Sequence, residues 1–428
     1  MRNANVCALT AALVLALQSA ASAADWPQWR GPQRNDVTTE DSGRDHGAWP
    51  LGKPLWMASV GYGGTSPVVA KGRVYAMGWD RDKDSVFCLN AGTGLVRWVR
   101  QYPCPPYGRY HRADEGAYRG PSSTPAYDAA TGYLYTLSLD GDLNCWDAGD
   151  KGKNLWHLNL YEAYKVPQRP DAGGGAHDYG YTTSPLVYGD SVIAEVGDDQ
   201  GNLMAFDKRT GQRRWTSQCK DPAGQTGGLV PMTVEGLPCV AVLTLRRLLL
   251  ARLDAGHEGQ TLATYDWQTH YANNIATPAV AGDSVVLTSG YNISKTARIR
   301  ITLRGAEMVW EQRVYSQVCS PVIYNDHVYM AWGEVRCLDF ATGATKWSGG
   351  QFGNDGSCLV TGDGRLIVFG NKRIALVETA DRSPDAYREL SVKAGVGGSP
   401  GWPHVVLAEG KLLVKDASGD IYCFALGG

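Results

Sequence analysis

The sequence contains no adjacent pair of cysteines, no CxxC motif and no CxxCH motif, although it has ten cysteines in 428 residues. Structural zinc sites and c-type haem attachment depend on such closely spaced cysteines, so neither is supported. Charge of one sign is also lacking, since 41 lysines and arginines against 43 aspartates and glutamates give a formal net charge of −2. This balance argues against a nucleic-acid partner held by bulk electrostatics. We therefore expect neither a metal site nor a nucleic-acid partner.

Long hydrophobic runs are missing as well, because no stretch after residue 23 is apolar for long enough to cross a bilayer as a helix. At the start, Arg2 is followed by an apolar run to Leu17 and then by small residues ending at Ala23. This order is typical of a signal peptide, and we predict cleavage near Ala23. We expect an exported monomer, periplasmic or secreted, without an integral membrane segment. An N-terminal anchor left uncleaved is the alternative.

What the sequence does contain is a repeated turn that is followed by tryptophan. Residues 206–215 read FDKRTGQRRW, and residues 89–98 and 338–347 repeat the spacing of Asp or Asn, Thr-Gly and Trp. A degraded copy runs over residues 146–156. The Asp or Asn can hydrogen-bond its own turn backbone, and Gly takes the positive φ that other residues avoid. Each copy therefore predicts a tight turn between two strands.

A second repeated feature is a small residue, often followed by proline, that opens each unit. The mean spacing of these openings is about 48 residues, which is typical of four-stranded propeller blades rather than helical repeats. The short runs between them are rich in Val, Ile and Tyr with frequent turns, which indicates an all-β chain. The openings are Ser66, Thr124, Ser184, Val230, Thr277, Ser320, Ser357 and Ser399.

The eighth unit has three strands before the chain stops at Gly428, and a spare strand containing Trp56 stands at residues 55–60 without a turn before it. A sheet that lacks an outer strand and a spare strand at the other end of the chain together close a ring, which removes exposed edges. We predict a single eight-bladed propeller of four-stranded antiparallel blades over residues 54–428, with seven blades as the alternative. Residues 24–53 are predicted to form an irregular lead-in, after the signal peptide at residues 1–23.

Two residue types recur at fixed positions in the repeat. Half of the 14 tryptophans lie on the outer strand, where we interpret them as packing between neighbouring blades: Trp56, Trp98, Trp156, Trp215, Trp267, Trp310 and Trp347. A second slot, just before the turn, is shared by Cys and Ala, which indicates a small buried position. It holds Cys88, Cys145, Cys337, Cys423, Ala205 and Ala251. Among the other cysteines, only Cys219 and Cys239 are considered as a disulfide pair, and their redox state stays open.

These residues resemble the pyrrolo-quinoline quinone (PQQ)-like β-propeller repeat, whose hallmark is Ala-x-Asp-x-x-Thr-Gly-x-x-x-Trp. The resemblance covers nearly the whole chain after residue 23, including the opening WPQWRGP of the lead-in. It implies two different activities. Quinoprotein alcohol dehydrogenases bind PQQ and calcium over the propeller, whereas the barrel-assembly lipoprotein of the bacterial outer membrane uses a similar propeller to bind proteins. This chain lacks the vicinal disulfide of the dehydrogenases and the cleavage-site cysteine of the lipoprotein.

The connections between blades hold the candidate site residues, because such loops cluster around the central channel of a propeller. Two are long, and long connections in a compact fold are usually functional. The first, 103–121, contains Tyr107, Arg109, Tyr110, His111, Arg112, Asp114, Glu115 and Arg119. The second, 161–182, contains Arg169, His177, Asp178, Tyr179 and Tyr181. The equivalent junctions of other blades hold Tyr62, His270, Asn273, Asn274, Asn354 and Asp355.

Two functions are consistent with these residues. Tyr and Arg are favoured at binding hot spots, which predicts an exported scaffold that holds a protein, peptide or glycan partner, or alternatively a structural cap over the adjacent blades. The second function is a short quinoprotein-like dehydrogenase that oxidises alcohols or sugars with PQQ and Ca²⁺. Its catalytic base would come from Asp114, Glu115, Asp171 or Asp178. No matched catalytic set is found in the sequence, and we favour the scaffold.

Overall fold

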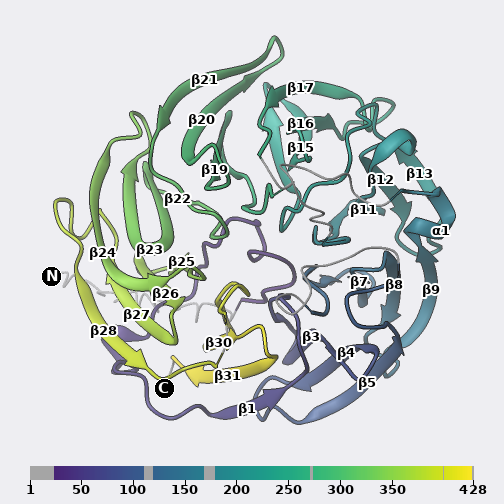
Figure 1. Cartoon of the computed structure of the whole chain (residues 1–428). Helices are drawn as coiled ribbons and strands as arrows, with labels where there is room; N and C mark the ends of the chain where they lie inside the picture. The colour runs from purple at the N-terminus through teal and green to yellow at the C-terminus, as the bar shows by residue number, and fades with distance from the viewer. Residues whose placement is uncertain (1–23, 110–118, 168–178, 270–272, 399, 427–428) are drawn as a thin grey trace, which may run out of the picture.

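Eight antiparallel sheets stand around a central axis in the computed structural model, which describes residues 24–109, 119–167, 179–269, 273–398 and 400–426 (Figure 1). Within each blade the strands follow one another outward from the axis. The single α-helix among the described residues is α1 (Leu160–Tyr164), capped by Asn159, whose side chain accepts from the Glu162 amide. No helix of the described chain is long enough to cross a membrane.

The strand bounds follow the predicted repeat. Blades one and two contain β2 (Val68–Ala70), β3 (Arg73–Asp80), β4 (Lys83–Asn90), β5 (Val96–Pro103), β6 (Ala126–Asp128), β7 (Tyr133–Leu137), β8 (Asp142–Asp147) and β9 (Lys153–Asn159). Blades three and four contain β10 (Leu186–Tyr188), β11 (Ser191–Glu195), β12 (Leu203–Asp207), β13 (Arg213–Thr216), β14 (Val230–Val234), β15 (Leu237–Leu243), β16 (Arg247–Arg252) and β17 (Thr261–Asp266). Blades five and six contain β18 (Ala279–Ala281), β19 (Ser284–Ser289), β20 (Lys295–Thr302), β21 (Gly305–Gln312), β22 (Val322–Tyr324), β23 (His327–Asp339) and β24 (Thr345–Gly353). Blades seven and eight contain β25 (Ser357–Val360), β26 (Arg365–Gly370), β27 (Arg373–Glu378), β28 (Glu389–Ala394), β29 (Val406–Ala408), β30 (Lys411–Lys415), β31 (Asp420–Ala425) and β1 (Trp56–Ser59).

Blade six has three named strands because β23 supplies both middle positions. The first part of β23 pairs with β22, with Val322 opposite Tyr329, and its last part pairs with β24, with Cys337 opposite Trp347. Gly333, between the two parts, has a φ of 70°, which glycine adopts without strain.

The ring closes as predicted. Strand β1 pairs antiparallel with β31, with Trp56 opposite Cys423 and Ser59 opposite Asp420, so the last blade is completed from the N-terminal side of the chain. The eight-bladed architecture is therefore confirmed, and the seven-bladed alternative is wrong. Because the blades form a closed ring, every blade has a neighbour on both sides.

The slot shared by cysteine and alanine lies directly across the sheet from the outer-strand tryptophan. Cys88 is opposite Trp98, Ala205 is opposite Trp215, and Cys423 is opposite Trp56. A small side chain on the third strand leaves room for the indole on the fourth, since cross-strand neighbours have Cβ atoms only about 4.5–5.5 Å apart. All nine cysteines of the described residues are free thiols, Cys219 and Cys239 included.

The lead-in crosses the centre of the ring instead of lying on its surface (Figure 1). Arg30 and Arg34 are fully buried there and donate to backbone carbonyls of three blades: Pro185, Leu229 and Pro321. The Trp29 indole donates to Thr277 Oγ1 at 3.0 Å. Residues from blades three to six are thereby tied to one segment at the axis.

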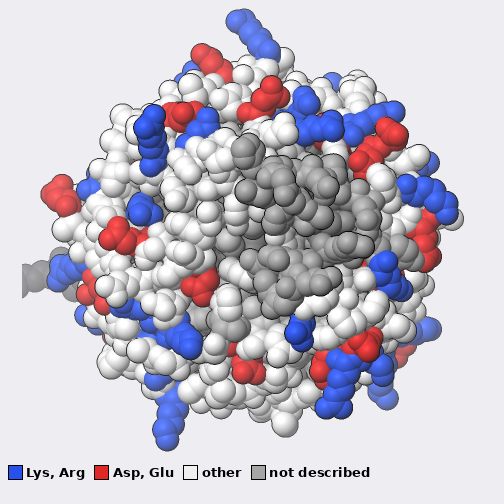
Figure 2. Space-filling model, viewed as in Figure 1, with Lys and Arg blue, Asp and Glu red and all other residues white. Residues whose placement is uncertain are grey.

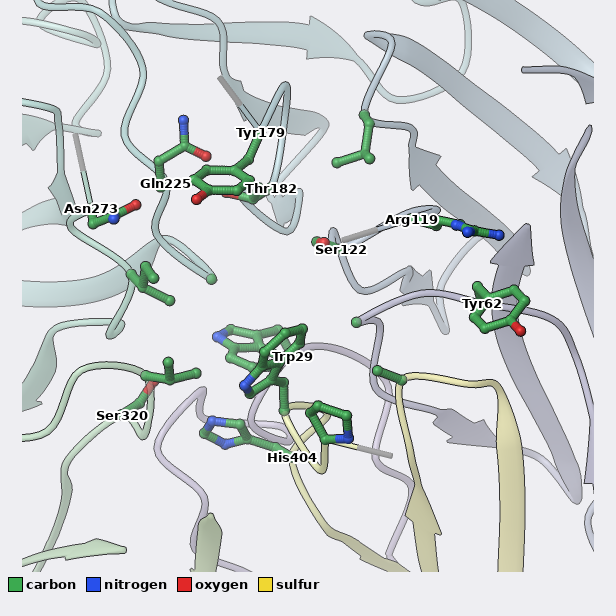
Figure 3. A pocket seen from close by; sticks show the side chains of 18 of the residues that line it. Trp29, Tyr62, Arg119, Ser122, Tyr179, Thr182, Gln225, Asn273, Ser320 and His404 are labelled. Carbon is green, nitrogen blue, oxygen red and sulfur yellow. The ribbon is translucent and has the colours of Figure 1, made fainter. Parts of the chain in front are cut away.

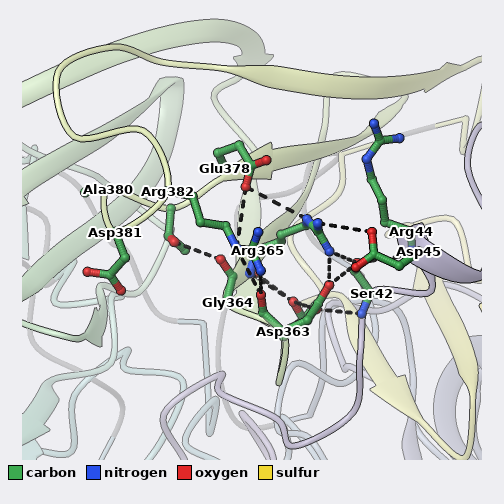
Figure 4. Close-up of polar contacts among 12 residues, drawn as sticks. Ser42, Arg44, Asp45, Asp363, Gly364, Arg365, Glu378, Ala380, Asp381 and Arg382 are labelled. Carbon is green, nitrogen blue, oxygen red and sulfur yellow. Dashed lines mark hydrogen bonds and ion pairs between the residues drawn. The ribbon is translucent and has the colours of Figure 1, made fainter.

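The second half of the lead-in is fixed to blade seven by an ionic network (Figure 4). The amide and hydroxyl of Ser42 donate to the Asp363 carboxylate at 2.8 and 2.7 Å. Arg365, which is buried, pairs with the same carboxylate and with Asp45. Hydrogen bonds from Thr361 and Ser42, together with the charge of Arg365, hold the pKa of Asp363 below its ordinary value although burial opposes this.

Candidate functional site

Hydroxyl groups at the blade openings hold the wall of the channel. The amide of Ser66 donates to Thr124 Oγ1 in the next blade at 2.9 Å, and the amide of Thr124 donates to Ser184 Oγ at 2.9 Å. Across the closing seam, the amide of His404 donates to Ser66 Oγ at 2.8 Å. The proline that follows the small residue has no amide hydrogen to donate. The small residue therefore supplies both groups of this chain of bonds: its amide donates to the next blade, and its hydroxyl oxygen accepts from the previous one. The openings therefore position the residues just before them at the axis.

A cavity of about 400 Å³ lies at this axis, in the range of small-molecule sites. Figure 3 shows its side chains, which come from the lead-in and from the junctions between blades. Most of the lining is apolar or aromatic. It consists of Trp29, Tyr62, Gly64, Arg119, Ser122, Leu139, Tyr179, Thr182, Gln225, Gly227, Asn273, Ile275, Tyr291, Val318, Ser320, Pro400, Trp402, His404, Ala417 and Ser418.

Trp29 and His404 form one end of the cavity, with ring centroids 4.4 Å apart. His404 Nδ1 lies 3.0 Å from Asp36 Oδ2, and the same oxygen accepts from Arg30 Nε. Burial alone would raise the pKa of Asp36, but Arg30 and His404 together hold it below its ordinary value. At this end of the cavity, the ion pair of Arg30 and Asp36 is therefore covered by the rings of Trp29 and His404.

Three predicted residues form a stack at the mouth of the cavity. The Arg119 guanidinium lies over the ring of Tyr62 at 5.6 Å from the centroid and over the ring of Tyr107 at 5.8 Å. Tyr62 is 45% exposed although it is large and aromatic. A cation between two aromatic rings is an attractive arrangement that also orders the long arginine side chain. We call Tyr62, Tyr107 and Arg119 the rim stack.

Arg109 is bound to carboxylates rather than directed into the cavity. Its amide and Nε donate to Asp140 at 2.6 and 2.9 Å, and Nη2 donates to Asp142. Asp84 lies beside these carboxylates, buried, and neither of its oxygens has a hydrogen-bond partner. Burial, reinforced by the charges of Asp140 and Asp142, raises the pKa of Asp84 to about 8. Arg109 thus anchors the start of the long first junction on blade two.

The structure brings four predicted residues together around the cavity, namely Tyr62, Arg119, Tyr179 and Asn273. Tyr107 joins them through Arg119. Tyr181 is buried against Tyr161, and Asn274 is buried with its amide donating to the carbonyls of Thr244 and Trp267. Asp355 caps the Gly401 and Asn371 amides, and neither it nor Asn354 lines the cavity. The remaining candidates lie outside the described residues: Tyr110, His111, Arg112, Asp114, Glu115, Arg169, Asp171, His177, Asp178 and His270.

Most of the other lining residues were not predicted from the sequence, and three of them, Trp29, His404 and Gln225, matter most for the chemistry of the cavity. Trp29 is in the lead-in, which was treated as irregular, and His404 follows the eighth opening. Gln225 is in the junction between blades three and four, at a position equivalent to the candidate residues in the junctions of other blades. Its distance before the opening at Val230 is the signal that could have identified it.

The described residues do not fit PQQ with calcium. Calcium takes six to eight oxygen ligands, among which carboxylates are prominent, and no aspartate or glutamate occurs among the described lining residues. No group of three His, Cys, Asp or Glu side chains in the described ranges could hold a metal ion. An anionic quinone would also need positive charge, and among the described lining residues Arg119 lies against the tyrosine rings of the rim stack, while His404 is hydrogen-bonded to Asp36.

The closed ring, the four-stranded blades and the Asp/Asn-x-x-Thr-Gly turns with their tryptophans define a PQQ-like β-propeller. A family model described as outer membrane protein assembly factor BamB matches residues 112–349, more than half of the sequence, and the chain belongs to this family. A comparison with curated proteins gives no match.

Solved structures share the fold at low identity. BamB from Moraxella catarrhalis superposes with a TM-score of 0.56 at 12% identity, covering 87% of this chain and 97% of that chain. Quinohemoprotein alcohol dehydrogenase from Comamonas testosteroni gives 0.63 at 14% identity, covering 94% and 81%. The C-terminal WD40 domain of Sif2 gives 0.54 at 10% identity, covering 88% and 98%. Because these neighbours include different classes of protein, the likeness establishes the fold alone.

Proposed function

We propose that this protein is an exported binding scaffold, released after cleavage near Ala23, that holds a protein, peptide or glycan partner at the cavity mouth. The single observation that carries the proposal is the rim stack. Tyr62 is held exposed at the mouth of the cavity by Arg119, and both residue types dominate binding energy at interfaces.

The chemistry of the cavity supports binding over oxidation. A dehydrogenase of the quinoprotein type needs calcium ligands and a general base beside the substrate. The described lining offers aromatic rings, amides and hydroxyl groups, but no carboxylate for either role. These groups suit recognition, in which apolar surface supplies affinity and a few polar groups fix orientation.

The face drawn in Figure 2 carries charges of both signs. Lysine and arginine side chains alternate with aspartate and glutamate around this face, and no single-sign patch covers the described residues seen there (Figure 2). Such a mixed surface does not favour polyanions or polycations. Specificity would therefore come from the aromatic and hydrogen-bonding groups that line the cavity.

Site-specific cross-linking tests the proposal. A photoreactive phenylalanine analogue at position 62 is expected to give a discrete adduct in cells, and R119A, which removes the stack, should reduce its yield. The same analogue at Tyr188, an exposed tyrosine of blade three outside the cavity, is the matched control. Equal adducts at the two positions would count against a binding face at the mouth.

A cofactor titration tests the enzymatic alternative. PQQ with Ca²⁺ should leave the melting temperature of the purified protein unchanged, since only ligands that bind the folded state raise apparent stability. Addition of alcohols or sugars should then give no reduction of a redox dye. A clear rise in the melting temperature together with reduction of the dye would contradict the scaffold proposal and indicate a dehydrogenase.

A further inference from the structure

The cavity contains hydrogen-bonding groups that no described residue satisfies. Gln225 is 3% exposed, and neither its Nε2 nor its Oε1 has a partner. Asn273 is 5% exposed, and its Oδ1 is also without a partner. A buried polar group without a hydrogen-bond partner destabilises the folded protein, so these amides are unfavourable unless another molecule bonds them. A ligand with both donors and acceptors would do so.

Another part of the cavity lining is apolar. The indole nitrogen of Trp29 is already committed to Thr277 Oγ1, so the ring offers carbon surface to the cavity. Ile275, Val318 and Leu139 add aliphatic groups to the lining. The ligand must therefore combine hydroxyl or amide groups with a carbon–hydrogen face.

The interior is also neutral among the described residues. Arg119 lies at the mouth between two tyrosine rings, and His404 is paired with the buried Asp36. A charged ligand would lose its hydration without meeting an available counter-charge, which is costly. An uncharged ligand avoids this loss.

The polar groups of the junctions follow a curve rather than a straight line. Ser122, Thr182, Gln225 and Asn273 come from four successive blade junctions, and Figure 3 shows them one after another in an arc along one side of the space. An extended peptide presents its donors and acceptors along one direction. A sugar ring presents hydroxyl groups around its perimeter and carbon–hydrogen faces above and below.

We propose that the cavity binds the end of a neutral carbohydrate, one or two pyranose units long. The ring face packs on Trp29, and the hydroxyl groups bond Gln225 and Asn273. The cavity of about 400 Å³ has room for such a unit. This inference rests on the proposed binding function and narrows its ligand to a neutral glycan.

Titration of the purified full chain with maltose, cellobiose and diacetylchitobiose, followed by tryptophan fluorescence and calorimetry, tests this proposal. At least one should bind and change the emission, because Trp29 and Trp402 line the cavity. Digalacturonate, which is charged, should bind at least tenfold more weakly. Q225L should raise the Kd about tenfold through the loss of hydrogen bonds to the ligand, without lowering the melting temperature.

Q212L is the matched control, because Gln212 is exposed in the turn before β13 and should not affect sugar binding. If none of the three sugars binds, or if Q225L and Q212L bind equally well, the carbohydrate assignment is wrong. A capped dipeptide that binds more tightly than every sugar would also overturn it. The cross-link at position 62 would survive these results, so the failure of the ligand class is distinguishable from the failure of the scaffold function.

Discussion

The indole of Trp56 lies on the α-carbon of Gly94 in the neighbouring blade. A Cβ at residue 94 would stand 2.6 Å from Trp56 Cε3, and the indole nitrogen donates to the Ala91 carbonyl of the same turn at 2.9 Å. Trp98 covers Gly152 in the same way, and Trp156 covers Gly211. The glycine of the repeat is therefore required twice, by its positive φ and by the ring that covers it.

This contact predicts that Gly94→Ala destabilises the protein more than Gly72→Ala. Both glycines have a φ of 69°, but nothing lies within 4 Å of a Cβ at residue 72. Gly72→Ala should cost about 1 kcal/mol of backbone strain, and Gly94→Ala should cost about 1–3 kcal/mol more through overpacking against Trp56. Urea unfolding measures both values. Equal losses would show that the ring moves aside freely.

The ion pair between Arg30 and Asp36 beneath the cavity predicts a pH-dependent loss of stability in Arg30→Met. Removal of the guanidinium leaves Asp36 buried with only His404, which should cost about 3–5 kcal/mol of unfolding free energy. The pKa of Asp36 should rise in the variant, so its defect should shrink as the pH falls and the carboxyl is protonated. Thermal unfolding from pH 4 to 8 gives the profile. Arg44→Met, at an exposed arginine of the same lead-in, should have little effect at any pH.

Asp84 predicts a loss of stability with rising pH. Its pKa is raised to about 8 in the folded protein, so between about pH 4 and pH 8 the folded state binds a proton that the unfolded state has released. The contribution of this group should decline by up to about 1.4 kcal/mol per pH unit across that window. Asp84→Asn should flatten the profile and be more stable than the parent at pH 8. The exposed Asp385→Asn is the comparison, and parallel profiles for the two variants would disprove the role of Asp84.

The burial of the cysteines predicts how many thiols react in the native protein. Eight of the nine described cysteines are buried, whereas Cys219 is half-buried. An aromatic disulfide reagent should therefore modify about one thiol in the native protein and all of them in denaturant. Cys219→Ser should abolish the native reaction. A count of two fewer thiols in denaturant would instead indicate a disulfide, with Cys219 and Cys239 as the first pair to examine.

The ring could be predicted from the sequence because its determinants are local and repeated. The spacing of the turn glycine and tryptophan, the Cys/Ala slot and the spare strand at Trp56 each lie within one unit or at a chain end. The role of the lead-in could not be predicted in this way. Arg30 meets Pro321 across 291 residues and Trp29 meets Thr277 across 248, and no periodic pattern marks such contacts.

The cavity could be predicted only in part for the same reason. Junction residues were expected near the axis, and Tyr62, Arg119, Tyr179 and Asn273 do line it. Whether a junction side chain faces the axis or packs beneath depends on the turn that carries it. Tyr181 and Asn274 are each next to a lining residue in the sequence. Their side chains nevertheless point into the protein interior, where they donate hydrogen bonds to backbone carbonyls.

The buried arginines of the lead-in hold part of the N-terminal segment at the axis of the ring. Trp29 continues this segment into the lining of the cavity, where its ring packs against His404. A ligand in the cavity would therefore touch a surface that the N-terminal segment supplies, so we expect its affinity to depend on how firmly that segment is attached to the blades.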